Sequence, residues 1–122
     1  MVTIFFIKLG HFKALNLFLK KHLKEKCSKL YKIISFKEKN LTNLYRIDKK
    51  LPLGLLFYST TSLKNIKIKS KKKHVKFLVL DKKFLSNKNL SLIKKKIYFY
   101  TVRNKNLFKK YNESKNLIFE NL

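Results

Sequence analysis

A dense run of lysines is the part of this sequence whose residue types and spacing could do chemistry. Residues 65–80 read NIKIKSKKKHVKFLVL, with Lys71, Lys72 and Lys73 adjacent to His74 and to strand-forming residues on both sides. Ammonium groups at this density can neutralise phosphates and release their counterions. The alternative is a solvated hairpin tip whose charges prevent edge-to-edge aggregation.

The charge of the whole chain favours a polyanionic partner over the solvated tip. The 122 residues carry 31 Lys and Arg against 6 Asp and Glu, a formal net charge of +25. Such a charge attracts polyanions from a distance and is spread along the chain. An anionic membrane surface is the competing polyanion. The longest uncharged stretch, residues 51–63, is too short to span a bilayer.

Other kinds of site are not predicted. His11 has no Asp, Glu, Cys or Ser placed to form a catalytic pair with it, and the six acids are widely separated in sequence. Two glycines cannot build a glycine-rich phosphate loop. The single cysteine and three dispersed histidines show no metal-ligand spacing. We therefore expect no enzyme, no metal and no cofactor.

Residue usage indicates where the chain is encoded. All basic residues except Arg46 and Arg103 are lysine, and Asn, Ile, Leu and Phe are abundant. These preferences follow A/T-rich codons, as in an organellar genome. No secretory signal is visible at the N-terminus, and the first 24 residues resemble a transit peptide less than a strand followed by a helix. The expected location is the mitochondrial matrix, with the plastid as the alternative.

The periodicity of apolar residues predicts an α+β fold. Strands are predicted at residues 3–9, 30–36 and 97–102, and helices at 11–29 and 86–96, with a loop at 37–50. In the strand at 97–102, alternation places Tyr98 and Tyr100 on one face and Phe99 on the other. Residues of about 55–80 are predicted as a long protruding β-hairpin. This order is the ferredoxin-like split β-α-β arrangement. It defines a domain over residues 1–102, followed by a tail or docking helix over residues 103–122.

Short motifs in this order resemble the small-subunit ribosomal protein S ten family, above all its mitochondrial members. The segment FIKLGHFKALNLF, residues 6–18, is similar to the first strand and helix start of that family. Further matches follow in the family's order: Leu51-Pro52, Phe57-Tyr58-Ser59-Thr60, Ser70-Lys71-Lys72 and Phe77-Leu78-Val79. The resemblance covers roughly residues 3–102, and Asn16 replaces the acid usual in the family.

The resemblance implies a structural component of the head of an organellar small ribosomal subunit, with a role in translation. Its partners would be small-subunit rRNA and neighbouring proteins of the S three, S nine and S fourteen type, with no small-molecule substrate. The hairpin would contact rRNA phosphates through Lys67, Lys69, Lys71, Lys72, Lys73, His74 and Lys76. The first strand–helix junction would do so through Lys8, His11 and Lys13. The alternative function is a basic accessory subunit of an organellar respiratory or ATP synthase complex.

Overall fold

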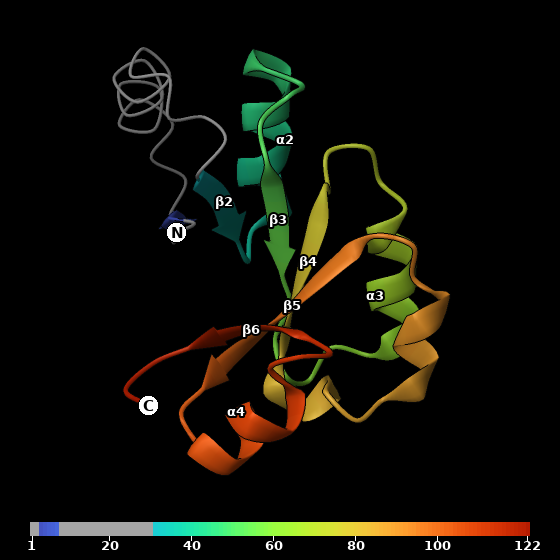
Figure 1. The fold of residues 1–122 in the computed structure, drawn as a ribbon. Helices are drawn as coiled ribbons and strands as arrows, with labels where there is room; N and C mark the ends of the chain where they lie inside the picture. Colours follow the sequence, from blue (N-terminus) through green and yellow to red (C-terminus); the bar gives the residue numbers. More distant parts are fainter. Residues whose placement is uncertain (1–2, 8–30) are drawn as a thin grey trace.

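A single all-parallel sheet organises the molecule. The computed structural model describes residues 3–7 and 31–122. In this part the sheet has six strands in the order β1-β2-β3-β4-β5-β6, and every neighbouring pair is parallel. The strands are β1 (Thr3–Ile7), β2 (Tyr31–Ser35), β3 (Leu53–Leu56), β4 (Phe77–Asp81), β5 (Lys96–Val102) and β6 (Asn116–Phe119). The sheet curls rather than lying flat (Figure 1).

From β2 onward, helical segments connect successive strands, as parallel pairing requires. They are α2 (Glu38–Ile47), α3 (Leu63–Ser70), α4 (Lys105–Tyr111) and the 3-10 helices η2 (Lys82–Phe84) and η3 (Lys88–Leu92). Strands that follow one another both in sequence and in the sheet, with helices between them, are the pattern of a (β/α)8 barrel. The described strands form an open part of such a ring.

The ferredoxin-like prediction, with its protruding hairpin, is wrong. Gly54, Leu55 and Leu56 of β3 pair in parallel with Phe77, Leu78 and Val79 of β4, and α3 crosses between the two strands. No antiparallel pair occurs among the described strands.

The alternation in NIKIK was misread because it also fits a short helix. Ile66 is buried and Ile68 is exposed, since they lie on different sides of α3. Ser62 caps α3 by accepting a hydrogen bond from the Asn65 backbone N–H.

Two apolar clusters cover the two faces of the sheet. The helix face is packed by α2, α3 and the 3-10 helices, and its buried strand residues are Ile33, Leu53, Leu55, Leu78, Leu80 and Phe99. The opposite face, called the inner face below, is built on Ile34, Leu56, Phe77 and Val79, with Phe36, Tyr98, Tyr100 and Ile118 partly buried against them. Because both faces are covered, every residue of β3 is buried, as is typical of parallel sheets.

The remaining element predictions had mixed outcomes. The strands predicted at 30–36 and 97–102 are confirmed as β2 and β5, and the described part of the strand predicted at 3–9 is confirmed as β1. Tyr98 and Tyr100 do lie opposite Phe99. The loop predicted at 37–50 is helix α2, whose buried Asn40 amide donates to the Ser35 hydroxyl. The helix predicted at 86–96 is only the 3-10 helix η3. The tail contains α4 and β6, and the helix predicted at 11–29 lies outside the described residues.

Candidate functional site

Those of the predicted phosphate-contacting lysines that the structure describes lie on α3 and on the segment between α3 and β4. Lys67 and Lys69 are on α3, Lys71–Lys73 follow it, and His74 and Lys76 precede β4. The ammonium group of Lys76 lies 5.3 Å from the centre of the Tyr45 ring. Lys8, His11 and Lys13 lie outside the described residues. These lysines do not sit on a hairpin, and their contact with phosphate stays a prediction.

Glu38, in the first turn of α2, engages several of these residues. Its Oε2 accepts a hydrogen bond from Lys72 Nζ at 2.7 Å and lies 3.0 Å from His74 Nε2. Lys69 Nζ is 3.9 Å from Glu38 Oε1. Burial works to raise the pKa of Glu38, but the hydrogen bond and charge of Lys72, together with His74, outweigh it and lower that pKa. This part of the lysine run therefore joins α2 to the α3–β4 connection.

The carboxyl edge of the sheet gathers aromatic side chains from four strands or their ends. The rings of Phe36 and Tyr58 are stacked with centres 4.3 Å apart. Phe6 and Tyr100 meet the Phe36 ring edge-on, at 5.7 and 6.2 Å. Tyr58 is 61% exposed and Phe6 is 42% exposed, so this cluster forms a partly open apolar floor.

Polar groups surround this floor. Tyr100 donates its hydroxyl to the Phe57 carbonyl at 2.7 Å. Burial, followed by the charges of Asp81 and Tyr58, raises the pKa of Tyr100, which keeps the phenol protonated. Asp81 ends β4 in alternation with Phe77 and Val79 of the inner face. One oxygen of Asp81 accepts the Lys83 backbone N–H at 2.9 Å.

An exposed ion pair completes the edge. Arg103 follows β5 and lies 3.2 Å from the Glu120 carboxylate, which follows β6. Both side chains are more than half exposed, so the pair can open to admit a ligand at low cost. The edge thus combines an aromatic floor, a carboxylate and a guanidinium. In the part of the chain that the structure describes, no three His, Cys, Asp or Glu residues lie close enough together to hold a metal ion.

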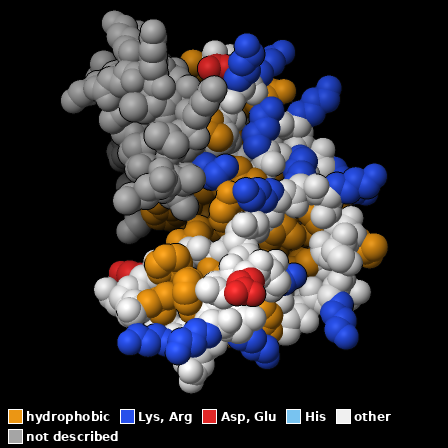
Figure 2. Space-filling model, in the orientation of Figure 1, with side chains coloured by type: hydrophobic (Ala, Val, Ile, Leu, Met, Phe, Trp, Pro, Cys, Tyr) orange, Lys and Arg blue, Asp and Glu red, His pale blue; other side chains and the backbone are white. Residues whose placement is uncertain are grey.

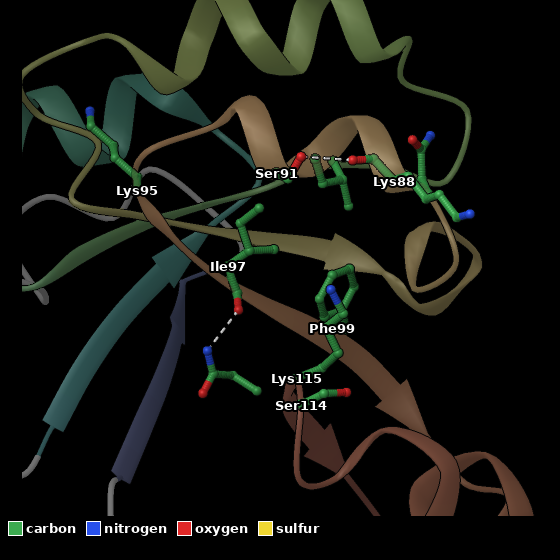
Figure 3. Close-up of a pocket in the computed structure, with 10 residues that line it drawn as sticks. Lys88, Ser91, Lys95, Ile97, Phe99, Ser114 and Lys115 are labelled. Atoms are coloured by element: carbon green, nitrogen blue, oxygen red, sulfur yellow. Dashed lines mark hydrogen bonds between the residues drawn. The ribbon is translucent and has the colours of Figure 1, made fainter.

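A separate cavity of about 390 Å³ has Leu90 and Phe99 of the helix-face cluster in its lining (Figure 3). It is lined by residues of η3, β5 and the turn before β6: Asn87, Lys88, Leu90, Ser91, Lys95, Ile97, Phe99, Ser114, Lys115 and Asn116. Several of its polar groups are already bonded within the chain. The Asn116 amide donates to the Ile97 carbonyl, and the Ser91 hydroxyl donates to the Lys88 carbonyl. Lys95 donates to the carbonyls of Lys72 and Val75.

Within residues 3–7 and 31–122, no helix is long and apolar enough to cross a membrane.

Comparison with known proteins identifies the fold. No family model matches the sequence, and no curated protein matches it. Among solved structures, a glycerophosphodiester phosphodiesterase from Parabacteroides distasonis matches with a TM-score of 0.72 at 17% identity over 97% of this chain. A protein from Silicibacter pomeroyi assigned as a glycerophosphoryl diester phosphodiesterase matches 83% of the chain with a TM-score of 0.64 at 12% identity.

The third structure is an Oleispira antarctica phosphodiesterase in complex with its product sn-glycerol-3-phosphate. It matches 73% of this chain with a TM-score of 0.57 at 18% identity. The chain spans 52% of the Parabacteroides structure and 37% of each of the other two. All three likenesses show a shared fold.

These findings correct the functional predictions. The resemblance to the ribosomal protein S ten family is wrong, because the similar structures are phosphodiesterases and the sheet is parallel. The same findings contradict the predicted ribosomal role and its rRNA and ribosomal-protein partners. They also contradict the alternative role as a respiratory or ATP synthase subunit. The expectation of no enzyme and no small-molecule substrate is also overturned by the three phosphodiesterases.

Sequence reasoning missed the carboxyl-edge residues because they are far apart in the chain. Asp81, Arg103 and Glu120 were noted only in composition, and Tyr58 only as part of the family resemblance. The available signal was the position of Asp81 and Arg103 directly at or after predicted strands, since the carboxyl ends of parallel strands share one edge. That signal can be used only once the strands are known to be parallel.

Proposed function

We propose that this chain acts on glycerophosphodiesters, as a phosphodiesterase whose substrate lies at the carboxyl edge of the sheet. The likeness to the Parabacteroides enzyme over 97% of the chain carries this proposal. The site is assigned to the carboxyl edge because active sites of (β/α)8 barrels lie at that end of the strands.

Hydrolysis of a phosphodiester joins a water oxygen to phosphorus and breaks one P–O ester bond. The products are a phosphate monoester and an alcohol, and the alcohol takes a proton as it leaves. The reaction needs a base for the water, an acid for the leaving oxygen and positive charge for the phosphoryl oxygens.

Residues of the carboxyl edge can supply part of this chemistry. Asp81 is the carboxylate placed to accept the proton of water, because one of its oxygens is anchored by Lys83 N–H and the other can face the substrate. Arg103 can release Glu120 and pair with phosphoryl oxygens through two N–H groups. His11 follows the carboxyl end of β1 by four residues in the sequence, which makes it the candidate acid for the leaving group.

The charge of the chain supports an anionic substrate. Lys and Arg side chains are scattered over the described surface in Figure 2, and few acidic side chains lie among them. A field of this sign raises the local concentration of a phosphodiester and its rate of encounter.

The test is release of sn-glycerol-3-phosphate from glycerophosphocholine, followed with a coupled dehydrogenase assay in the presence and absence of added divalent cations. Replacing Asp81 with Asn should lower kcat about a hundredfold or more, as expected for loss of a general base. Asp48→Asn is the matched control, because Asp48 also accepts a backbone N–H two residues later, that of Lys50 at 2.9 Å, but lies beyond α2. A wild-type protein that releases no product under any of these conditions contradicts the proposal, as does equal loss in both variants.

The predicted location in the mitochondrion, or alternatively the plastid, stays a proposal that rests on residue usage. Fractionation of cells that express a tagged chain tests it.

A further inference from the structure

An amphipathic surface at the amino edge of the sheet has no role in the proposed reaction. It comprises the lysines Lys67, Lys71 and Lys94 and the exposed aliphatic residues Ile68 and Leu92, and is called the amino-edge surface below. A groove of about 410 Å³ runs through it, lined by Lys67, Ser70, Lys71, Leu92, Ile93, Lys94 and Lys95. Leu92 is 70% exposed and Ile68 is 54% exposed.

Helix geometry places the α3 members of this surface together. Ile66 and Ser70 face the core, and Leu63 packs against it. At 100° per residue, Lys67, Ile68 and Lys71 then lie around one side of α3. Lys69 lies on the other side, where it approaches Glu38.

The lysines of the amino-edge surface have no acidic partner within the described residues. The Glu38 carboxylate is already paired with Lys69, Lys72 and His74. The groove lining contains no Asp or Glu, and none of Lys67, Lys71 and Lys94 makes an ion pair in the described part of the chain. Lys95 is structural, because its ammonium group donates to two backbone carbonyls. We therefore expect the positive charge of the amino-edge surface to attract an anionic partner.

We propose that the amino-edge surface docks on a membrane containing anionic lipids. Lysines around exposed leucine and isoleucine match a surface with charged headgroups above acyl chains. A single-stranded nucleic acid fits less well, because its bases stack on aromatic rings and the exposed apolar residues here are aliphatic.

The amino-edge surface and the proposed catalytic residues lie at opposite ends of the strands. Lys71 follows the end of α3 and Lys94 precedes β5, so both lie near the amino ends of the strands, whereas Asp81 and Arg103 lie at the carboxyl ends. A chain docked in this way turns its carboxyl edge toward water. The docking surface would then anchor the protein, and substrate would arrive from solution. The inference on docking does not depend on the proposed hydrolysis.

The test is co-sedimentation of the protein with phosphatidylcholine vesicles that contain about 30% phosphatidylserine, compared with phosphatidylcholine alone. The variant Lys67→Gln/Lys71→Gln/Lys94→Gln should reduce partitioning roughly a hundredfold, at about fivefold for each lysine near an anionic surface. Leu92→Ser should reduce it roughly tenfold, because the leucine no longer enters the acyl region.

The matched control is Lys105→Gln/Lys109→Gln/Lys110→Gln, which removes the same charge from α4. The control should lose much less binding than the amino-edge variant. Equal losses would mean that only the net charge matters and would overturn the proposal. It would also be overturned if Leu92→Ser bound as well as wild type, or if the amino-edge variant lost affinity for a homopolymeric RNA but not for vesicles.

Discussion

Gly54 is the residue whose substitution tests the parallel packing of β3 on β4 most sharply. A Cβ atom added there would lie 2.2 Å from Phe77 Cε2, 2.3 Å from Cζ and 2.7 Å from Cδ2. Real Cβ contacts are not this short, so the Phe77 ring must move. That ring is 4% exposed, meets Tyr98 edge-on at 5.4 Å and lies 5.0 Å from the ammonium group of Lys32.

We expect Gly54→Ala to destabilise the protein by about 2 kcal/mol, within the range of ~1–3 kcal/mol for overpacking a core. Part of this is loss of the Phe77–Tyr98 ring contact, worth about 1 kcal/mol. With a urea m-value of about 2 kcal/mol per molar, the midpoint should fall by roughly 1 M. Circular dichroism during urea titration measures this shift.

A double-mutant cycle with Phe77→Leu checks the cause. The smaller side chain makes room for the methyl group, so Gly54→Ala should cost less than half as much in the Phe77→Leu background. If Gly54 instead lay in an open strand, Ala would stabilise the protein by about 0.4–1 kcal/mol through the unfolded state. A stabilised single variant, or costs that simply add in the double variant, would refute the packing described for β3 and β4.

Three further predictions concern single polar contacts. Glu38→Gln should lower the free energy of unfolding by up to about 1 kcal/mol near neutral pH. Because the pKa of Glu38 is lowered in the folded state, its contribution to stability is present above the unfolded-state pKa and is lost as the pH falls through the folded-state pKa. The urea midpoints of variant and wild type should therefore converge in acid. Tyr100→Phe should lower the free energy of unfolding by about 1 kcal/mol, because the hydrogen bond to the Phe57 carbonyl is lost. An absorbance titration should then find one tyrosine fewer that ionises above the pH range of ordinary tyrosines. Ser62→Ala should cost about 1 kcal/mol by uncapping α3, with Ser62→Asp restoring thermal stability, whereas unchanged melting of the alanine variant would exclude the cap.

The sequence contains strong information about individual strands and weak information about their partners. IYFYTV was predicted as a strand and is one, because its alternating aromatic residues are partly or fully buried on both faces of β5. Pairing direction depends on the connection, and the 55–80 connection was misjudged when α3 was taken for a hairpin strand. The uninterrupted apolar runs LGLLF and FLVL, which are typical of strands buried on both faces, were the available signs of a parallel sheet.

The candidate site was less predictable than the fold. The lysine run was visible as a charge pattern, but its link to Glu38 crosses more than thirty residues and depends on the packing of α2, which was predicted as a loop. The approach of Tyr58, Asp81 and Tyr100 likewise follows from sheet order rather than from spacing in the chain. Local periodicity cannot supply either contact.

The most direct test of the account is phosphorus NMR of glycerophosphocholine incubated with the purified protein in ¹⁸O-labelled water. We expect a growing phosphomonoester resonance that carries the isotope shift of one labelled oxygen. Asp81→Asn should abolish this resonance, and Asp48→Asn should retain it. A diester resonance that stays constant with the wild-type chain, with or without added divalent cations, would contradict it.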